Sequence, residues 1–294
     1  MQLIKAEVLG YCMGVRRAVT MAEEAVKAAA GVHRVYTLGP LIHNPQVLER
    51  FRSQGLDILD ETELPQDLVS SVVIIRAHGI TPQMETVLAC KGARLVDATC
   101  PTVKKSQMKA RSLTDAGYRI FLAGERYHGE VIGIQGYAPS CLVVADPGEA
   151  TEKAEALYHS APTAKTALLS QTTIAPDEYQ RIAQAIHAYF PTLEIIDTIC
   201  KATRDRQYAL SKLCPQVDAL LVIGGKESAN TRRLLAIAQA LGKPAWLLER
   251  AAEIPPGIRA YPVVGLAAGA STPDELIDRI ARALTNRTLI GENL

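Results

Sequence analysis

The chain has 294 residues, of which 48% are hydrophobic and 21% charged, and 32 Lys and Arg residues nearly balance 31 Asp and Glu residues. A chain of this length can bury roughly 75% of its unfolded surface, and no block of like charges offers nucleic acid a binding surface. The N-terminus has no basic segment before an apolar stretch, and no run of 18 apolar residues occurs. We therefore expect a cytoplasmic protein with neither nucleic-acid nor membrane partners.

Short β-rich runs alternate with helical patterns along the chain. The four clearest pairs of strand and helix are 71–79 with 81–92, 118–124 with 129–133, 166–173 with 175–190, and 218–225 with 228–242. Continuous apolar strands such as VVIIR and LLVIG favour burial on both faces, as in parallel sheets covered by helices. The alternation therefore predicts an α/β protein with largely parallel sheets.

Three cysteines stand in similar turns at long intervals. Cys12, Cys100 and Cys200 occur in GYCMGV, VDATCPT and DTICKAT, each just after an apolar run, and lie 88 and 100 residues apart. The similar flanks suggest equivalent positions in a repeated αβα lobe. The predicted division is into lobes at 13–100, at 101–196, and at 197–283 with the first strand from 1–12, followed by a C-terminal tail at 284–294.

The spacing of these cysteines favours a metal or iron-sulfur site over simple burial. A structural zinc site normally gains rigidity from close C-x2-C pairs and a fourth ligand, which this pattern lacks, so zinc is the less favoured alternative. A cubane iron-sulfur cluster accepts thiolates from distant segments and, with three cysteines, leaves one iron open to substrate. The other cysteines lie in ordinary surroundings and are predicted to be structural: Cys90, Cys141 and Cys214.

Polar residues of chemical interest cluster where predicted strands end and helices begin. Ligands of open α/β sheets bind outside the carboxyl ends of the strands, so we expect these residues to share one central cavity. Imidazoles, hydroxyls, an amide and helix-start N–H groups can all donate to an anion, which suits a diphosphate. The candidate donors are His43, His78, His128, Ser228, Asn230 and Ser271. We interpret His33, His159 and His187 as ordinary, partly exposed residues.

Glu130 is the candidate general acid. It lies two residues after His128, at the predicted start of a helix, where acidic residues are also common for dipole reasons alone. No other acidic side chain is so close in sequence to a candidate anion site, so we predict that Glu130 donates a proton and that Thr172 relays it.

With these residues identified, nearly the whole chain resembles the LytB/IspH family of hydroxymethylbutenyl diphosphate reductases. The motifs that carry the resemblance occur in the family's order and are GYCMGV, LIHN, AHGIT, DATCP, HGEV, QTT, DTICKATRDRQ, KESANTRRL and GAST. Two positions depart from the pattern common in this family. Gly129 replaces a frequent Pro and is expected to hold Glu130 less firmly, and Ala229 supplies no side-chain donor beside Ser228 and Asn230.

The resemblance implies a site, a fold and a reaction. Cys12, Cys100 and Cys200 would bind a [4Fe-4S] cluster whose open iron takes the substrate hydroxyl. The diphosphate contacts would be His43, His78, His128, Ser228, Asn230 and Ser271, and the proton-delivery pair Glu130 and Thr172. The family's fold has three similar αβα lobes in a pseudo-threefold arrangement around a central iron-sulfur cluster.

The implied reaction is the reductive dehydroxylation of 4-hydroxy-3-methylbut-2-enyl diphosphate to isopentenyl and dimethylallyl diphosphate. It is the last step of the methylerythritol phosphate route, and it needs a one-electron donor such as ferredoxin or flavodoxin. Two alternatives remain open. One is another three-cysteine cluster enzyme, of the quinolinate synthase kind, against which the histidine set argues. The other is a redox or metal sensor, for which the chain lacks a basic face or partner helix.

Overall fold

The computed structural model describes residues 1–29 and 33–285, which form two compact units. One unit contains residues 1–16, residues 42–50 and the chain from residue 201 on, and the other contains residues 17–41 and 51–200. The described residues include three sheets of four strands, and every strand pair in them is parallel. The first unit holds one sheet and the second unit holds two.

The first sheet of the second unit has the strand order β3-β2-β4-β5. Its strands are β2 (Arg34–Leu38), β3 (Leu56–Leu59), β4 (Ser71–Ile75) and β5 (Arg94–Asp97). Every residue of β4 is buried, which accords with the continuous apolar run in the sequence. Helix α3 (Pro82–Cys90) packs its buried Leu88 into a core that includes Val73 and Ile75 of β4.

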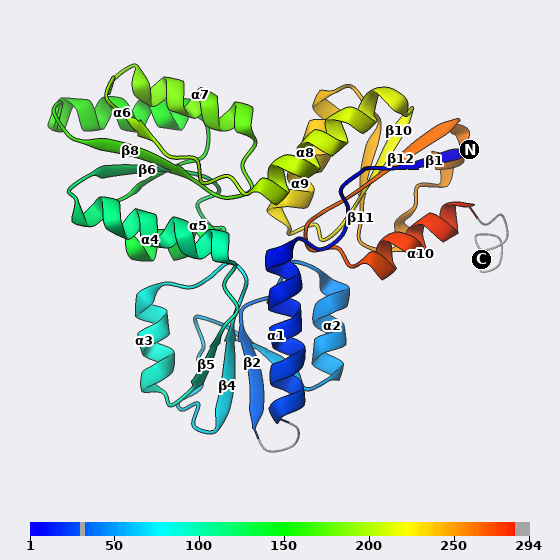
Figure 1. Ribbon diagram of the computed structural model, residues 1–294, viewed down its shortest axis with the longest axis horizontal. Coiled ribbons are helices and arrows are strands. Elements are labelled where there is room, and N and C mark those ends of the chain that lie inside the picture. The colour runs from blue at the N-terminus through cyan, green and yellow to red at the C-terminus, as the bar shows by residue number, and fades with distance from the viewer. Residues whose placement is uncertain (30–32, 286–294) are drawn as a thin grey trace. The chain divides into compact units, whose positions relative to one another are not determined.

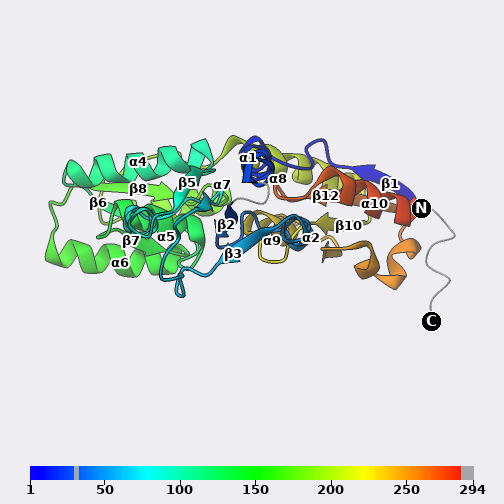
Figure 2. The same cartoon turned by 90° about the horizontal axis from the view of Figure 1, so that it is seen from below.

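The second sheet of this unit has the order β7-β6-β8-β9 and is covered on both faces. Its strands are β6 (Arg119–Ala123), β7 (Leu142–Val144), β8 (Thr166–Ser170) and β9 (Glu194–Ile195). Alternate residues of β6 enter different cores, because successive side chains of a strand point to opposite faces. Phe121 packs under α6 (Pro147–Ser160) and α7 (Pro176–His187), and Leu122 packs under α4 (Pro101–Asp115) and α5 (Gly129–Tyr137). Figure 1 shows these helix pairs on opposite faces of the sheet, and Figure 2 draws the same elements from below.

The sheet of the first unit has the order β1-β12-β10-β11. Its strands are β1 (Gln2–Lys5), β10 (Ala219–Ile223), β11 (Ala245–Leu248) and β12 (Val263–Ala268). One face packs against α10 (Asp274–Thr285), and the other packs against α8 (Lys201–Leu213) and α9 (Ala229–Ala240) (Figure 1). The N-terminal strand thus joins the sheet built from the last third of the chain.

All three sheets repeat one strand order. Each begins with a central strand, adds an outer neighbour, and returns to the other side for a third strand: β2, β3 and β4; β6, β7 and β8; β10, β11 and β12. The fourth strand, at the edge beside the third, is always the one that precedes a candidate cysteine: β5, β9 and β1. The prediction of three α/β lobes with parallel sheets is therefore confirmed. The lobe boundaries at 13–100, 101–196 and 197–283 stay a prediction.

The remaining elements are helices and short 3-10 turns. They are α1 (Met13–Ala29), α2 (Pro45–Ser53), and the 3-10 turns Cys214–Gln216, Ala251–Glu253 and Pro256–Ala260. Helices α2, α3, α4, α6 and α7 all begin with proline, which is favoured at the first helical position because its missing N–H would have no helical partner there. From residue 286 on, the predicted tail at 284–294 lies outside the described residues. No described helix has both the length and the apolar character to cross a membrane.

Candidate functional site

The three candidate cluster cysteines occupy the same local position in their lobes. Each is the last residue before a helix: Cys12 before α1, Cys100 before α4 and Cys200 before α8. Each cysteine N–H donates to the carbonyl of the second residue after the third strand of its sheet. These hydrogen bonds are Cys12 to Ala270 at 3.1 Å, Cys100 to Ala77 at 2.9 Å and Cys200 to Thr172 at 3.0 Å. In every lobe the cysteine therefore stands between a strand end and a helix start.

This position suits a thiolate that binds a metal cluster. The positive end of a helix dipole favours a negatively charged group placed there, and the backbone N–H of Val15 donates to the Cys12 Sγ at 3.4 Å. All six cysteines of the chain are thiols, and these three are partly exposed, whereas Cys141 and Cys214 are buried. Burial raises the pKa of Cys141 to about 11 and also raises the pKa of Cys214, so both keep their protons near neutral pH. Cys90 is exposed, at the end of α3.

Two arginines that sequence reasoning missed hold the turns in front of these cysteines. Arg17 of α1 donates to the carbonyls of Thr99 at 3.1 Å and of Asp97 at 3.2 Å. Arg206 of α8, which is only 4% exposed, donates to the carbonyl of Gly10 at 2.6 Å. The sequence did place a basic residue shortly after two of the cysteines, with Arg17 five positions after Cys12 and Arg206 six positions after Cys200. It did not indicate which turn each arginine would contact.

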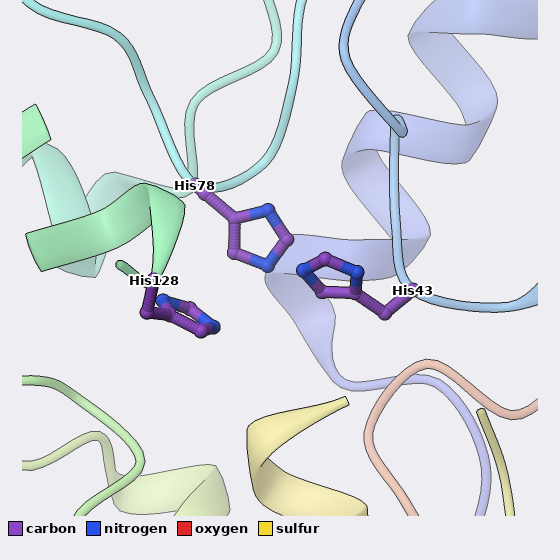
Figure 3. A group of neighbouring side chains, drawn as sticks. All are labelled: His43, His78 and His128. Carbon is purple, nitrogen blue, oxygen red and sulfur yellow. The ribbon is translucent and has the colours of Figure 1, made fainter. Parts of the chain in front are cut away.

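His78 and His128 lie together in the second unit, beside the Cys100 turn. His78 directly follows Ala77, the residue that accepts the Cys100 N–H. The two imidazole rings meet edge to face with centroids 5.1 Å apart (Figure 3). The Nδ1 of His128 accepts the Glu130 N–H at 3.2 Å and so caps α5. That bond leaves the proton of a neutral His128 on Nε2, where it can be donated to an anion.

Glu130 is buried on the first turn of α5, with a side chain held by one residue. Thr172 donates to its carboxylate twice, from the backbone N–H at 2.6 Å and from the hydroxyl at 2.8 Å. Burial raises the Glu130 pKa to about 7, although both bonds from Thr172 act to lower it. At neutral pH the carboxyl can therefore exist in both forms, as a proton donor requires.

Thr172 connects this acid to a candidate cluster cysteine. Its N–H and hydroxyl bind Glu130, while its carbonyl accepts the Cys200 N–H at 3.0 Å. The predicted acid, the predicted relay and one predicted ligand thus form a continuous hydrogen-bonded chain inside the second unit.

Arg76 is a third residue that sequence reasoning missed. It is 8% exposed, forms an ion pair with Glu61 and donates to the Leu38 carbonyl at 3.4 Å. Its guanidinium lies against the start of α5, because a Cβ atom added at Gly129 would stand 3.0 Å from Nη2 and 3.2 Å from Nε. Gly129 therefore leaves space for Arg76, and the looser placement expected for Glu130 stays a prediction.

Three other predicted site residues, Cys12, His43 and Ser271, lie in the first unit. The hydroxyl of Ser271 donates to the His43 carbonyl at 3.2 Å, and Ser271 follows Ala270, the acceptor of the Cys12 N–H. A Cβ atom at Gly225 would overlap the same His43 carbonyl, so only glycine allows this close approach. Cys12, His43 and Ser271 therefore belong to one packed group.

Ser228 and Asn230 form the start of α9 in the first unit. The Ser228 hydroxyl accepts the Thr231 N–H at 3.3 Å as an N-cap, which accounts for this residue without any ligand. Asn230 differs, because its side chain is buried at 4% exposure while neither amide atom has a hydrogen-bond partner in the described part of the chain. Leaving such a group unpaired in the folded state costs roughly 1–3 kcal/mol, which points to a bound polar ligand. Ala229, the first residue of α9, is also buried.

The three histidines left out of the candidate site lie elsewhere. His33 Nδ1 is 3.0 Å from the Ser70 carbonyl oxygen, His159 lies in the last turn of α6, and His187 ends α7. His43 is drawn with His78 and His128 in Figure 3 but belongs to the first unit.

The sequence matches the model of one protein family, described as LytB protein, over residues 3–285. The chain belongs to the LytB family. The resemblance noted in its motifs is thereby confirmed.

Curated relatives extend this match over almost the full length of the chain. The 4-hydroxy-3-methylbut-2-enyl diphosphate reductase of Treponema denticola is 46% identical over 284 residues, which cover 95% of this chain and 98% of the relative. The reductase of the same name from Aquifex aeolicus is 40% identical, covering 95% of this chain and 94% of its own.

Solved structures agree with the sequence relatives. The structure of the E-1-hydroxy-2-methyl-but-2-enyl-4-diphosphate reductase from Plasmodium falciparum is similar with a TM-score of 0.87 and 29% identity, covering 98% of this chain and 89% of that one. A second structure, of an (E)-4-hydroxy-3-methyl-but-2-enyl diphosphate reductase described as the terminal enzyme of the non-mevalonate pathway, is 38% identical with a TM-score of 0.68. It covers 97% of this chain and 99% of its own.

Proposed function

We propose that this chain is a 4-hydroxy-3-methylbut-2-enyl diphosphate reductase. It would convert its substrate to isopentenyl diphosphate or dimethylallyl diphosphate, with the uptake of two electrons and two protons and the release of water. The proposal rests on membership of the LytB family together with one observation, the hydrogen-bonded chain from Glu130 through Thr172 to Cys200. That chain links a proton donor with a pKa near 7 to a candidate cluster ligand.

Cys12, Cys100 and Cys200 are the proposed ligands of a [4Fe-4S] cluster. Their equivalent places at helix starts, their partial exposure and their thiol state all fit this role. When bound, the cluster supplies electrons one at a time and an open iron that acts as a Lewis acid toward the substrate hydroxyl.

The remaining site residues are proposed to bind and protonate the substrate. His43, His78, His128, Ser228, Asn230 and Ser271 would hold the diphosphate, with the unpartnered amide of Asn230 and the Nε2–H of His128 as donors. Protonated Glu130 would give its proton to the leaving hydroxyl oxygen, directly or through the Thr172 hydroxyl. Binding energy from the remote diphosphate would position the reacting carbon.

A one-electron carrier such as ferredoxin or flavodoxin is the proposed electron source. We propose the cytoplasm as the place of action, because reducing compartments keep such cysteines as thiols for a cluster. The proposal includes neither a nucleic-acid nor a membrane partner.

Cys100→Ser tests the ligand assignment. After anaerobic reconstitution, the parent protein should be brown and absorb at roughly 400 nm, as iron-sulfur proteins commonly do. Its Mössbauer spectrum should be that of a [4Fe-4S] cluster, and it should reduce the diphosphate substrate with reduced methyl viologen as donor. The variant should lose the absorbance and the turnover together. Cys90→Ser is the matched control and should keep both.

A Cys100→Ser protein that retains the cluster and full turnover would remove Cys100 from the ligand set. A parent protein that assembles the cluster but does not reduce the substrate would point to a different cluster enzyme or to a redox sensor.

A further inference from the structure

A pocket of about 450 Å³ opens in the second unit directly beside Cys100. Its wall includes Thr99 and Pro101, the two residues that flank this cysteine, and Met108 about two helical turns farther along α4. A cluster bound to Cys100 would thus be held by a residue whose two chain neighbours line the pocket. The pocket therefore lies where an electron could enter along a short covalent path.

The pocket is basic, although the chain as a whole is almost neutral. Arg17, Lys104 and Lys105 line it against a single acid, Asp97. The whole of α4 carries Lys104, Lys105, Lys109 and Arg111 but only one acidic residue, Asp115, while the formal net charge of the chain is +1. Positive charge is concentrated on α4, which begins directly after Cys100.

The arrangement of these cations does not suit a small anion. Arg17 is engaged with the backbone carbonyls of Thr99 and Asp97, and Lys104 pairs with the Asp97 carboxylate at 3.3 Å. Lys105 and the apolar Met108 are both exposed, Met108 at 41%. An exposed cation beside an apolar contact is typical of a surface that meets an oppositely charged protein, where the charge accelerates encounter more than it tightens binding.

We propose that this pocket and the exposed side of α4 form the docking surface for a small acidic one-electron carrier protein. The inference deepens the proposed function and rests on it, because that reaction takes two electrons and two protons from outside for each substrate molecule. Two carrier molecules in the reduced state would each lose one electron, and the substrate would lose its hydroxyl as water. Complementary charge and a small apolar contact give the weak, salt-sensitive complex that fast exchange of spent carrier requires.

Flavodoxin is the probe, because it is acidic and contains no iron that could exchange with the cluster. Binding of flavodoxin to the cluster-loaded protein is measured by calorimetric titration at low and at high salt, for the parent chain, Lys105→Glu and Lys165→Glu. Lys165 is exposed and precedes β8, at the end of its sheet opposite the cysteine turn, so its reversal makes the same change in net charge away from the pocket.

We expect Lys105→Glu to weaken flavodoxin binding about fivefold to tenfold at low ionic strength, and the loss to shrink as salt screens the charges. Flavodoxin-driven turnover should fall in parallel, while turnover driven by methyl viologen should match the parent. The control, Lys165→Glu, should bind as the parent does. Equal flavodoxin binding by Lys105→Glu and Lys165→Glu would overturn the docking surface, and so would a loss that is insensitive to salt.

Failure of the docking surface is distinct from failure of the proposed reaction. If the parent protein reduces the substrate with methyl viologen but the two charge reversals behave alike, the reaction stands and the docking surface is wrong. If Lys105→Glu alone weakens flavodoxin binding while no protein turns over substrate, the surface stands as a carrier site and the proposed reaction is wrong.

Discussion

Thr172 donates to both carboxylate oxygens of Glu130, from its N–H to Oε1 at 2.6 Å and from its hydroxyl to Oε2 at 2.8 Å. The two residues are 42 positions apart, and both are buried. When Glu130 is protonated, its O–H can donate to the Thr172 hydroxyl, which reverses that bond and turns the threonine proton outward. The pair can thus hold a proton at neutral pH and pass it on.

The pH dependence of turnover should follow the Glu130 carboxyl. Because burial raises its pKa to about 7, the protonated donor predominates below that pH and is lost above it. We expect kcat/KM to fall about tenfold per pH unit above pH 7, with methyl viologen as donor. Glu130→Gln should keep its cluster and lower kcat by about 10²–10⁴-fold, without that alkaline limb. A variant with normal turnover would exclude Glu130 as the acid.

Folding stability should change with pH through the same group. Below pH 4.5 the carboxyl is neutral in both the folded and the unfolded chain, but between about 4.5 and 7 the unfolded chain ionises first. The parent therefore loses stability as pH rises through this window, by of the order of 3 kcal/mol once pH exceeds 7. In urea unfolding, the free energy of unfolding of Glu130→Gln should rise relative to that of the parent as pH increases across that range. Glu152 is exposed, so the stability of Glu152→Gln should depend on pH as that of the parent does. If the stability of Glu130→Gln also runs parallel to that of the parent, the raised pKa of Glu130 is contradicted.

The Asn230 side chain should lower the folding stability of the chain but strengthen the binding of the substrate. Its amide is buried without a partner in the described part of the chain, so Asn230→Leu should raise the free energy of unfolding by about 1–3 kcal/mol in the absence of substrate. The same change should raise KM for the diphosphate substrate. Gln239→Leu, at an exposed position of the same helix, is the control and should alter neither quantity. An Asn230→Leu protein that binds substrate normally would remove this amide from the diphosphate site.

Gly129 and Arg76 should be energetically coupled. Alanine is a better helix former than glycine by about 1 kcal/mol, but a Cβ atom at 129 would press on the Arg76 guanidinium. Gly129→Ala should thus change stability little in the parent and stabilise the chain by about 0.5–1 kcal/mol when Arg76 is Met. Urea unfolding of the four proteins of this double-mutant cycle measures the coupling. The same effect of Gly129→Ala in both backgrounds would mean that Arg76 does not constrain the start of α5.

Local features of the site could be predicted where one short segment carries the signal. The segment 128–130 predicts a helix start. In the structure α5 begins there, with His128 as its N-cap and Glu130 in its first turn. The similar flanks of the three cysteines predicted equivalent positions, and each cysteine directly precedes a helix. The pairing of Glu130 with the Thr172 N–H had no local signal, since it depends on how α5 and the end of β8 are brought together.

The alternation of strands and helices can be predicted from the amino-acid sequence alone, and so can the family and the residue types at the site. Apolar periodicity, turn chemistry and motif order are all local properties of a chain. Three contacts become visible only in the folded chain. Arg17 holds the turn before Cys100, Arg76 fills the space left by Gly129, and Thr172 joins Glu130 to Cys200. The physical reason is that parallel strands are ordered by long crossovers, so side chains meet at strand ends according to sheet order rather than distance along the chain.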